Sequence, residues 1–132
     1  GIIRSHLEAS VTEQLAERLS LRPATTAAPA GTYSGGNQQK ALVARGMLHR
    51  ASVHVFDEPT VGIDVGAKAD VYAQLDRYAR EGAGVLLISS DLTEVIGVSD
   101  RVYVVAEGRI QAELTGDEIT ESAIASNFFT TS

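Results

Sequence analysis

Two short stretches that lie close together in the sequence constrain this chain more than any other feature. Residues 33–40 are Tyr-Ser-Gly-Gly-Asn-Gln-Gln-Lys, and residues 53–60 are Val-His-Val-Phe-Asp-Glu-Pro-Thr. In the first stretch, Ser34 suits the N-cap of a helix, and the paired glycines after it let a backbone approach a ligand closely. Because the first turn of a helix combines unpaired N–H groups with the positive end of the helix dipole, this stretch predicts a phosphate site.

The second stretch ends a short apolar run with two adjacent acids, Asp57 and Glu58. A carboxylate at the end of a strand beside a phosphate site suits Mg²⁺, and a second carboxylate suits the positioning of an attacking water. Adjacent acids at a strand end are more often simply solvated. The two residues by themselves therefore leave both interpretations open.

Composition limits the classes of function. A length of 132 residues with 44% hydrophobic content allows one small domain, or a piece of a larger one, with a core of its own. The formal net charge of −6 predicts no basic face for nucleic acid. The absence of cysteine rules out disulfides and thiolate metal sites and fits a reducing cytosol. No apolar run approaches the roughly 18 residues of a membrane span, so we expect a soluble chain.

Hydrophobic periodicity and capping residues, among them Asp91 with Glu94 at a capping-box spacing, predict alternating helices and strands. We expect helices over residues 5–21, 35–49, 64–79, 91–97 and 118–128, strands over 53–56 and 85–88, and a hairpin formed by 101–105 and 109–114. This alternation predicts an α/β fold, in which the apolar strand 53–56 lies buried in a parallel sheet. The expected core residues of the three longest helices are Leu7, Val11, Leu15, Leu19, Leu42, Met47, Leu48, Val71, Leu75 and Tyr78.

The two stretches together resemble the signature motif and the Walker B motif of an ATP-binding-cassette (ABC) ATPase, and residues 61–64 (Val-Gly-Ile-Asp) resemble its D-loop. The Asn-Gln-Gln-Lys sequence of residues 37–40 is similar to the bacterial sugar-importer branch of that family. A P-loop requires Gly-Lys followed by Ser or Thr, and neither Lys40 nor Lys68 follows a glycine. The chain therefore has no Walker A motif.

This resemblance implies an α/β fold that is the C-terminal portion of a P-loop NTPase (ABC ATPase) domain, lacking the Walker A strand and loop. It divides the chain into three parts. Residues 1–50 are expected to form part of the helical subdomain with the signature motif. Residues 51–114 are expected to carry the catalytic core strands, and residues 115–132 the C-terminal helix and tail.

ATP and Mg²⁺ are the cofactors that the resemblance implies. Asp57 would hold Mg²⁺ through water, and Glu58 would orient or deprotonate the attacking water. Asp64 would cap the helix that follows it and also cross a dimer interface towards the partner's Walker A motif. The residues implied in nucleotide binding across that interface are Ser34, Gly35, Gly36, Asn37 and Gln38. Lys40 ends the same stretch, and it can equally be only a solvated residue on the helix surface.

Ser90 stands where the family normally places a switch histidine that contacts the γ-phosphate. A serine can donate one hydrogen bond but has neither the charge nor the reach of an imidazole. We therefore treat Ser90 as a degenerate catalytic position, which resembles the second domain of the tandem ATPases in the sugar-importer branch. The three histidines, His6, His49 and His54, lie elsewhere and are expected to be surface or packing residues.

The resemblance implies an ATP-hydrolysing component of a bacterial carbohydrate importer, which is cytoplasmic and peripheral on the inner face of the plasma membrane. Its implied partners are integral membrane permease subunits, a second nucleotide-binding domain and, indirectly, an extracytoplasmic sugar-binding protein. Without a Walker A motif, the isolated chain is expected to be inactive. In the P-loop ATPase sheet that the resemblance implies, the missing strand lies between strands 85–88 and 101–105. The unpaired edges of these two strands predict that the isolated chain either pairs with another copy or closes the gap by rearranging.

Two other functions are compatible with parts of the sequence. A non-catalytic fragment that acts only through protein–protein contacts would also lack a Walker A motif. An ABC-type DNA-repair or chromosome ATPase would carry similar motifs, but long coiled-coil heptads lead into that lobe. Only one predicted helix and a loop rich in alanine precede the signature motif here, and the net charge is acidic.

Overall fold

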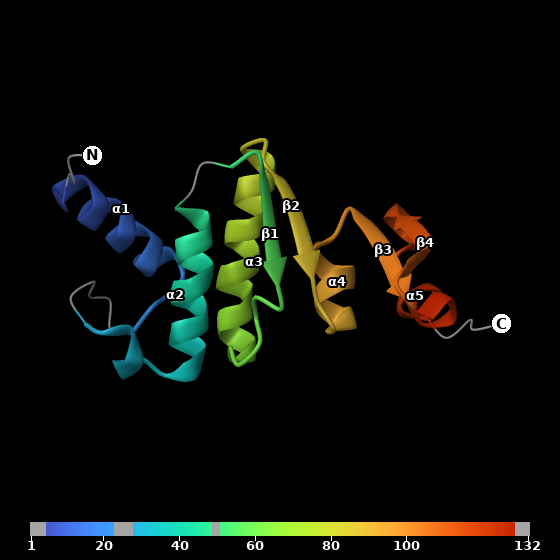
Figure 1. Ribbon diagram of the computed structural model, residues 1–132, viewed down its shortest axis with the longest axis horizontal. Helices are drawn as coiled ribbons and strands as arrows, with labels where there is room; N and C mark the ends of the chain where they lie inside the picture. Colours follow the sequence, from blue (N-terminus) through green and yellow to red (C-terminus); the bar gives the residue numbers. More distant parts are fainter. Residues whose placement is uncertain (1–4, 23–27, 49–50, 129–132) are drawn as a thin grey trace. The chain divides into compact units, whose positions relative to one another are not determined.

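The computed structural model describes residues 5–22, 28–48 and 51–128 of the chain (Figure 1). These residues fall into two compact units, residues 1–88 and residues 89–132. None of the helices in the described ranges is long and apolar enough to span a membrane. The predictions for Leu7 as a core residue, for His6 and His49 as surface or packing residues, and for residues 129–132 cannot be compared with the structure, because their side chains lie outside the described part.

The first unit is a two-stranded parallel sheet with helices packed against it. Its elements are α1 (Ser5–Arg18), the 3₁₀ turn η1 (Ala30–Thr32), α2 (Gly35–Met47), β1 (Val53–Asp57), α3 (Val65–Arg80) and β2 (Gly84–Ile88). Strand β1 pairs with β2 in parallel, in a register that runs from Val53 opposite Gly84 to Asp57 opposite Ile88. Figure 1 shows α2 and α3 side by side next to this sheet, as expected for an α/β unit.

The core of the first unit lies between the helices and one face of the sheet. Five of the predicted core residues are buried there: Leu15, Leu19, Met47, Val71 and Leu75. The prediction was wrong for Leu42, Leu48 and Val11, which are exposed. The inward face of α2 instead carries Lys40, Val43, Ala44 and Met47. Because these positions follow the i, i+3, i+4, i+7 spacing of one helix face, Leu42 necessarily points away.

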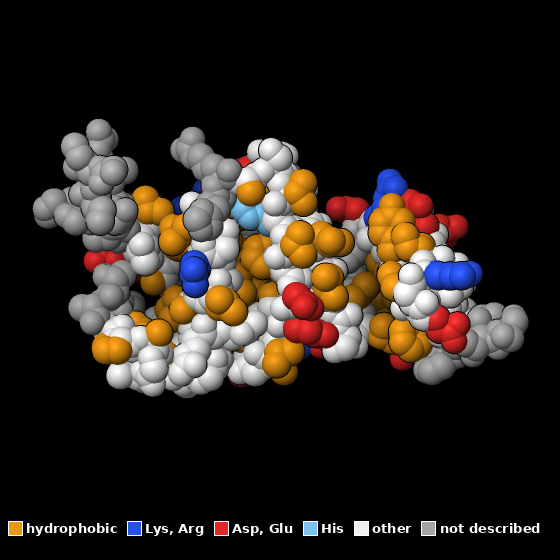
Figure 2. Space-filling model, viewed as in Figure 1, with side chains coloured by type: hydrophobic (Ala, Val, Ile, Leu, Met, Phe, Trp, Pro, Cys, Tyr) orange, Lys and Arg blue, Asp and Glu red, His pale blue; other side chains and the backbone are white. Residues whose placement is uncertain are grey.

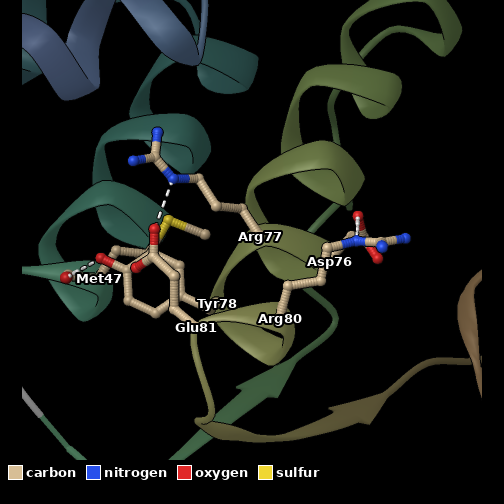
Figure 3. A network of polar contacts seen from close by, with 6 residues as sticks. All are labelled: Met47, Asp76, Arg77, Tyr78, Arg80 and Glu81. Carbon is tan, nitrogen blue, oxygen red and sulfur yellow. Dashed lines mark hydrogen bonds and ion pairs between the residues drawn. The ribbon is translucent and has the colours of Figure 1, made fainter.

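The C-terminal end of α3 contacts the C-terminal end of α2, and Figure 3 shows a network of polar contacts there. The Tyr78 hydroxyl donates a hydrogen bond to the backbone carbonyl of Met47 in α2. Burial raises the pKa of Tyr78, so the phenol stays protonated and keeps its donor. Two ion pairs along α3 flank this contact, Arg77 with Glu81 and Arg80 with Asp76, each with an N–O distance of 2.7 Å.

The expectation that strand 53–56 is buried on both faces was wrong. His54 and Phe56 point into the core, and His54 stacks on Phe56 and meets the ring of Tyr78 edge-on, so it is a packing residue as predicted. Val53 and Val55 on the other face are 61% and 60% exposed. In β2, Leu86 and Ile88 are also exposed, and Figure 2 shows apolar side chains over β1 and β2 on the face turned to the viewer. Among the described residues of the first unit, helices cover only one face of this sheet.

This exposed apolar face predicts that the isolated chain self-associates, because contiguous apolar surface on a short parallel sheet favours pairing with another copy. Sedimentation velocity over a range of concentrations should show dimers or larger species. Val55→Glu, in the centre of the face, should shift the distribution towards monomer. Val65→Glu is the matched control, because Val65 is 86% exposed at the start of α3 and outside the sheet. A monomer at every concentration would contradict the prediction.

The second unit is an antiparallel hairpin packed against helices. Its elements are α4 (Leu92–Val98), β3 (Arg101–Ala106), β4 (Arg109–Thr115), the 3₁₀ turn η2 (Gly116–Glu118) and α5 (Glu121–Phe128). The predicted hairpin is confirmed, with Glu107 and Gly108 at its turn, both at positive φ. Its core consists of Val102, Val104, Leu114, Ile119 and Ile124. In the described ranges the strands thus form two separate two-stranded sheets.

The last helix begins later than the predicted residue 118. Thr115 and Glu118 form a reciprocal capping box around the 3₁₀ turn η2. The Glu118 carboxylate accepts a hydrogen bond from the backbone N–H of Thr115 at 3.1 Å. Because Glu118 is used to close this turn, α5 starts only at Glu121.

Candidate functional site

The site begins at the N-terminus of α2, where Ser34 is the N-cap, as predicted. Its Oγ accepts hydrogen bonds from the backbone N–H of Asn37 at 3.4 Å and from the side-chain amide of Asn37 at 3.1 Å. Ser34 and Gly35 are exposed at this helix end. The capped first turn therefore presents an exposed helix terminus of the kind that attracts anions.

The side chains of Asn37 and Gln38 bind the segments that lead into α2. The Asn37 Oδ1 accepts a hydrogen bond from the backbone N–H of Arg22 at 3.2 Å, and the Gln38 Nε2 donates to the Tyr33 carbonyl at 2.9 Å. Both amides thus hold the loop in front of the helix. Their implied contact with nucleotide stays a prediction.

The two glycines of the signature stretch differ in their surroundings. A Cβ built on Gly36 would lie 2.8 Å from the carbonyl oxygen of Gly62 and 3.6 Å from the Cα of Ile63. A Cβ built on Gly35 would meet no described atom within 4 Å. Gly36 is therefore closely packed against the chain's own 61–64 loop, whereas Gly35 is open. The approach of a ligand to the two glycines stays a prediction.

The two acids follow the core strand directly. Asp57 is the last residue of β1 and is exposed, and Glu58 is half-buried. Glu58 has a φ of +47°, a left-handed conformation that is uncommon for a residue other than glycine. Its backbone N–H continues the β1–β2 ladder by donating to the Ile88 carbonyl at 2.8 Å. Its own carbonyl accepts from the backbone N–H of Val61 at 3.3 Å.

The loop after the acids turns back into α3. Gly62 has a φ of +74°, which glycine adopts readily. Asp64 is the N-cap of α3, and its Oδ1 accepts a hydrogen bond from the backbone N–H of Ala67 at 3.0 Å. The predicted capping role of Asp64 is confirmed. Its second implied role, across a dimer interface, stays a prediction.

Two contacts from α2, one to this loop segment and one to α3, were missed by sequence reasoning. The Gln39 Nε2 donates a hydrogen bond to the carbonyl of Glu58 at 3.1 Å. Lys40 is only 5% exposed, and its Nζ lies 3.9 Å from the Oδ2 of Asp70 in α3, so the solvated position considered for Lys40 was wrong. The only signal in the sequence was the helical spacing of positions 36, 39 and 40, which share one face.

Ser90 lies in the second unit, in the exposed segment between β2 and α4. The Ser89 hydroxyl donates to the Glu94 carboxylate at 2.5 Å and accepts from the backbone N–H of Asp91 at 3.0 Å. Asp91 caps α4, as predicted, by accepting from the N–H groups of Thr93 and Glu94. Glu94 is 3% exposed, and its carboxylate bonds to Ser89. Local hydrogen bonds thus organise the segment on both sides of Ser90.

The sequence has clear relatives among proteins of known function. Over 124 residues, 94% of the chain, it is 48% identical to ribose import ATP-binding protein RbsA 2 of Agrobacterium fabrum (strain C58 / ATCC 33970) and 46% identical to the protein of that name in Rhizobium meliloti (strain 1021). A ribose import ATP-binding protein of Yersinia pestis is 43% identical over the same length. Each match covers 24% of the relative, so the chain spans about a quarter of the length of these curated relatives. No protein-family model matches the chain.

Solved structures agree in fold. A dimeric bacterial ABC transporter cassette superposes with a TM-score of 0.78 at 18% identity, over 87% of this chain and 50% of the cassette. A nucleotide-free ATP-binding cassette of an ABC transporter superposes with a TM-score of 0.76 at 24% identity, over 93% of this chain and 48% of the cassette. The chain has the fold of an ABC ATPase cassette. The predicted fold class is thereby confirmed. The assignment of the two stretches and of residues 61–64 to the signature motif, the Walker B motif and the D-loop stays a prediction.

The two adjacent acids, Asp57 and Glu58, fit only part of a metal site. Among the described residues, no group of three or more His, Cys, Asp or Glu side chains could hold a metal ion. Mg²⁺ in nucleotide sites uses one or two carboxylates together with phosphate oxygens and water. The exposed carboxylate of Asp57 meets this requirement, provided that the nucleotide supplies the remaining ligands.

Proposed function

We propose that this chain belongs to the ATP-hydrolysing component of a bacterial ABC importer for a carbohydrate. The names of the relatives, which are ribose import ATP-binding proteins, support the assignment to an importer and to a carbohydrate substrate. The observation that carries the proposal is the arrangement around the Walker B acids. Glu58, directly after β1, is hydrogen-bonded to the same helix, α2, whose capped glycine terminus forms the signature motif.

In this proposal the Walker B acids have separate roles. The Asp57 carboxylate holds Mg²⁺, which supplies charge neutralisation for the phosphates when it is bound. Glu58 orients the attacking water and accepts its proton. The half-buried position of Glu58 suits this task, because a partly shielded carboxylate keeps a defined orientation.

The signature motif serves a different nucleotide from the Walker B acids. We assign Ser34, Gly35 and Gly36 to the γ-phosphate of ATP held on the Walker A motif of a second nucleotide-binding domain, with Asn37 and Gln38 beside them. Asp64 faces the same partner domain. The open surroundings of Gly35 support this assignment, because its backbone is accessible to a ligand.

Ser90 occupies the switch position of this domain. A hydroxyl there can donate one hydrogen bond to phosphate but cannot supply the charge of an imidazole. Hydrolysis at this site then depends on Glu58. We therefore assign the chain to the second domain of a tandem ATPase, and keep the division into a signature-bearing helical part (1–50), core strands (51–114) and a C-terminal part (115–132).

The proposed partners follow from this assignment. The chain would act within a longer polypeptide that carries two nucleotide-binding domains and docks on integral membrane permease subunits at the cytoplasmic side of the plasma membrane. An extracytoplasmic sugar-binding protein would take part indirectly. The acidic net charge and the importer relatives favour this function over an ATPase that acts on nucleic acid.

Calorimetric titration with Mg-ATP compares nucleotide binding by the isolated chain with binding by the full polypeptide. We expect no measurable binding to the isolated chain, because it has no Walker A motif to hold the β- and γ-phosphates. The full polypeptide should bind two ATP molecules. Clear micromolar binding to the isolated chain would contradict the proposal, since phosphates would then be held without a P-loop.

A further inference from the structure

One face of α2 meets the Walker B and D-loop segment at two points and helix α3 at a third. Gly36 approaches the Gly62 carbonyl, the Gln39 amide donates to the Glu58 carbonyl at 3.1 Å, and Lys40 lies 3.9 Å from Asp70. The positions 36, 39 and 40 are spaced i, i+3, i+4, so they necessarily share one helix face. Of the three contacts, only that of Gln39 acts directly on a Walker B acid.

The Glu58 backbone needs such a contact. A φ of +47° costs a residue other than glycine about 1 kcal/mol or more and persists only where surrounding bonds hold it. The N–H of Glu58 is bound to Ile88 of β2, and its carbonyl is shared between the N–H of Val61 and the amide of Gln39. Of these bonds, the one from Gln39 comes from a side chain, and that side chain belongs to helix α2.

We propose that Gln39 is a positioning residue that sets the orientation of Glu58 from the signature helix. This inference rests on the proposed function, in which Glu58 acts on the attacking water. Because Gln39 lies about one turn after the signature glycines on the same rigid helix, a movement of α2 when the signature motif engages a nucleotide is transmitted to the backbone of Glu58. The ATP site that contains Glu58 is thereby coupled to the ATP site that the signature motif completes on the partner domain.

The fold does not depend on the Gln39 bond. Val43 and Met47 anchor α2 in the core, and Lys40 and Gly36 keep their own contacts with α3 and with the 61–64 loop. Loss of the Gln39 amide should therefore leave stability nearly unchanged and alter only the placement of the acid. This separates a positioning role from a merely structural one.

The test is a single-turnover experiment on the full polypeptide with Mg-ATP, using Gln39→Met. Methionine keeps the length and flexibility of the side chain but has no donor. The reference is Glu58→Gln, which defines the phase of ADP formation that depends on the Walker B acid. We expect Gln39→Met to slow that phase about tenfold, the equivalent of one hydrogen bond, while the ATP concentration for half-saturation stays within about twofold.

Two further variants make the result decisive. Gln39→Lys, which restores a donor of sufficient reach, should recover most of the rate. Gln111→Met is the matched control, because Gln111 donates an equivalent bond to the Ala106 carbonyl at 3.2 Å in the hairpin of the second unit. It should leave the rate unchanged.

The outcomes separate the two proposals. If Glu58→Gln removes no phase of hydrolysis, the proposed function of the acid fails. If Glu58→Gln removes the phase but Gln39→Met leaves its rate unchanged, only the inference about Gln39 fails. A loss in Gln39→Met that Gln39→Lys does not recover, together with a lower unfolding temperature, would assign Gln39 a structural role instead.

Discussion

Replacement of Glu58 by Gln in the full polypeptide is expected to leave one of its two bound ATP molecules unhydrolysed. An amide keeps the size of the carboxylate but cannot accept a proton from the attacking water, and loss of a positioned base costs about 10²–10⁴ in rate. With Ser90 at the proposed switch position, residue 90 supplies no imidazole to compensate. The measurement is the number of ADP molecules formed per polypeptide in a single turnover.

The same experiment includes a control for binding. The Glu58→Gln variant should bind ATP as tightly as the unmodified polypeptide, because the proposed contacts with the phosphates come from other residues. Formation of two ADP at the normal rate by the variant would remove Glu58 from the mechanism. Weaker binding of ATP would instead give Glu58 a role in holding the nucleotide.

Gly36→Ala is expected to destabilise the domain by about 1–3 kcal/mol, as overpacking does elsewhere. The new methyl group would lie 2.8 Å from the Gly62 carbonyl, which is backbone and cannot rotate away. Helix α2 and the D-loop must therefore separate. Thermal unfolding of the full polypeptide measures the effect, and a lower unfolding temperature is the expected result.

Gly35→Ala is the matched control for this prediction. It introduces the same methyl group one residue earlier, where no described atom lies within 4 Å. Alanine also has a higher helix propensity than glycine, by about 1 kcal/mol. Gly35→Ala should therefore keep or raise the unfolding temperature. Equal destabilisation by both variants would show that the approach of Gly36 to Gly62 is not what the fold requires.

The sequence predicted most of the local structure. The N-caps Ser34, Asp64 and Asp91 were found from residue type and spacing, and each caps the expected helix. The separate strands β1 and β2 and the β3–β4 hairpin also follow from apolar runs and turn residues. These features depend on residues only a few positions apart, so a sequence pattern is sufficient to specify them.

Contacts between distant residues were decided only by the tertiary structure. Gln39 and Glu58 are far apart in the sequence, and nothing in either motif indicates that a side chain of one bonds to the backbone of the other. The burial of Lys40 and the exposure of Leu42 depend on how α2 packs on its neighbours, and the exposure of Val55 depends on which face of the sheet the helices cover.

The chain alone therefore determines the order of the motifs, the helix caps and the pair of acids at the end of β1. The tertiary structure decides which glycine is tightly packed, which amide reaches Glu58 and which sheet face is left exposed. The physical reason is the range of the interactions. Caps and strands are stabilised by neighbours in sequence, whereas close approach and burial require segments that only the folded core brings together.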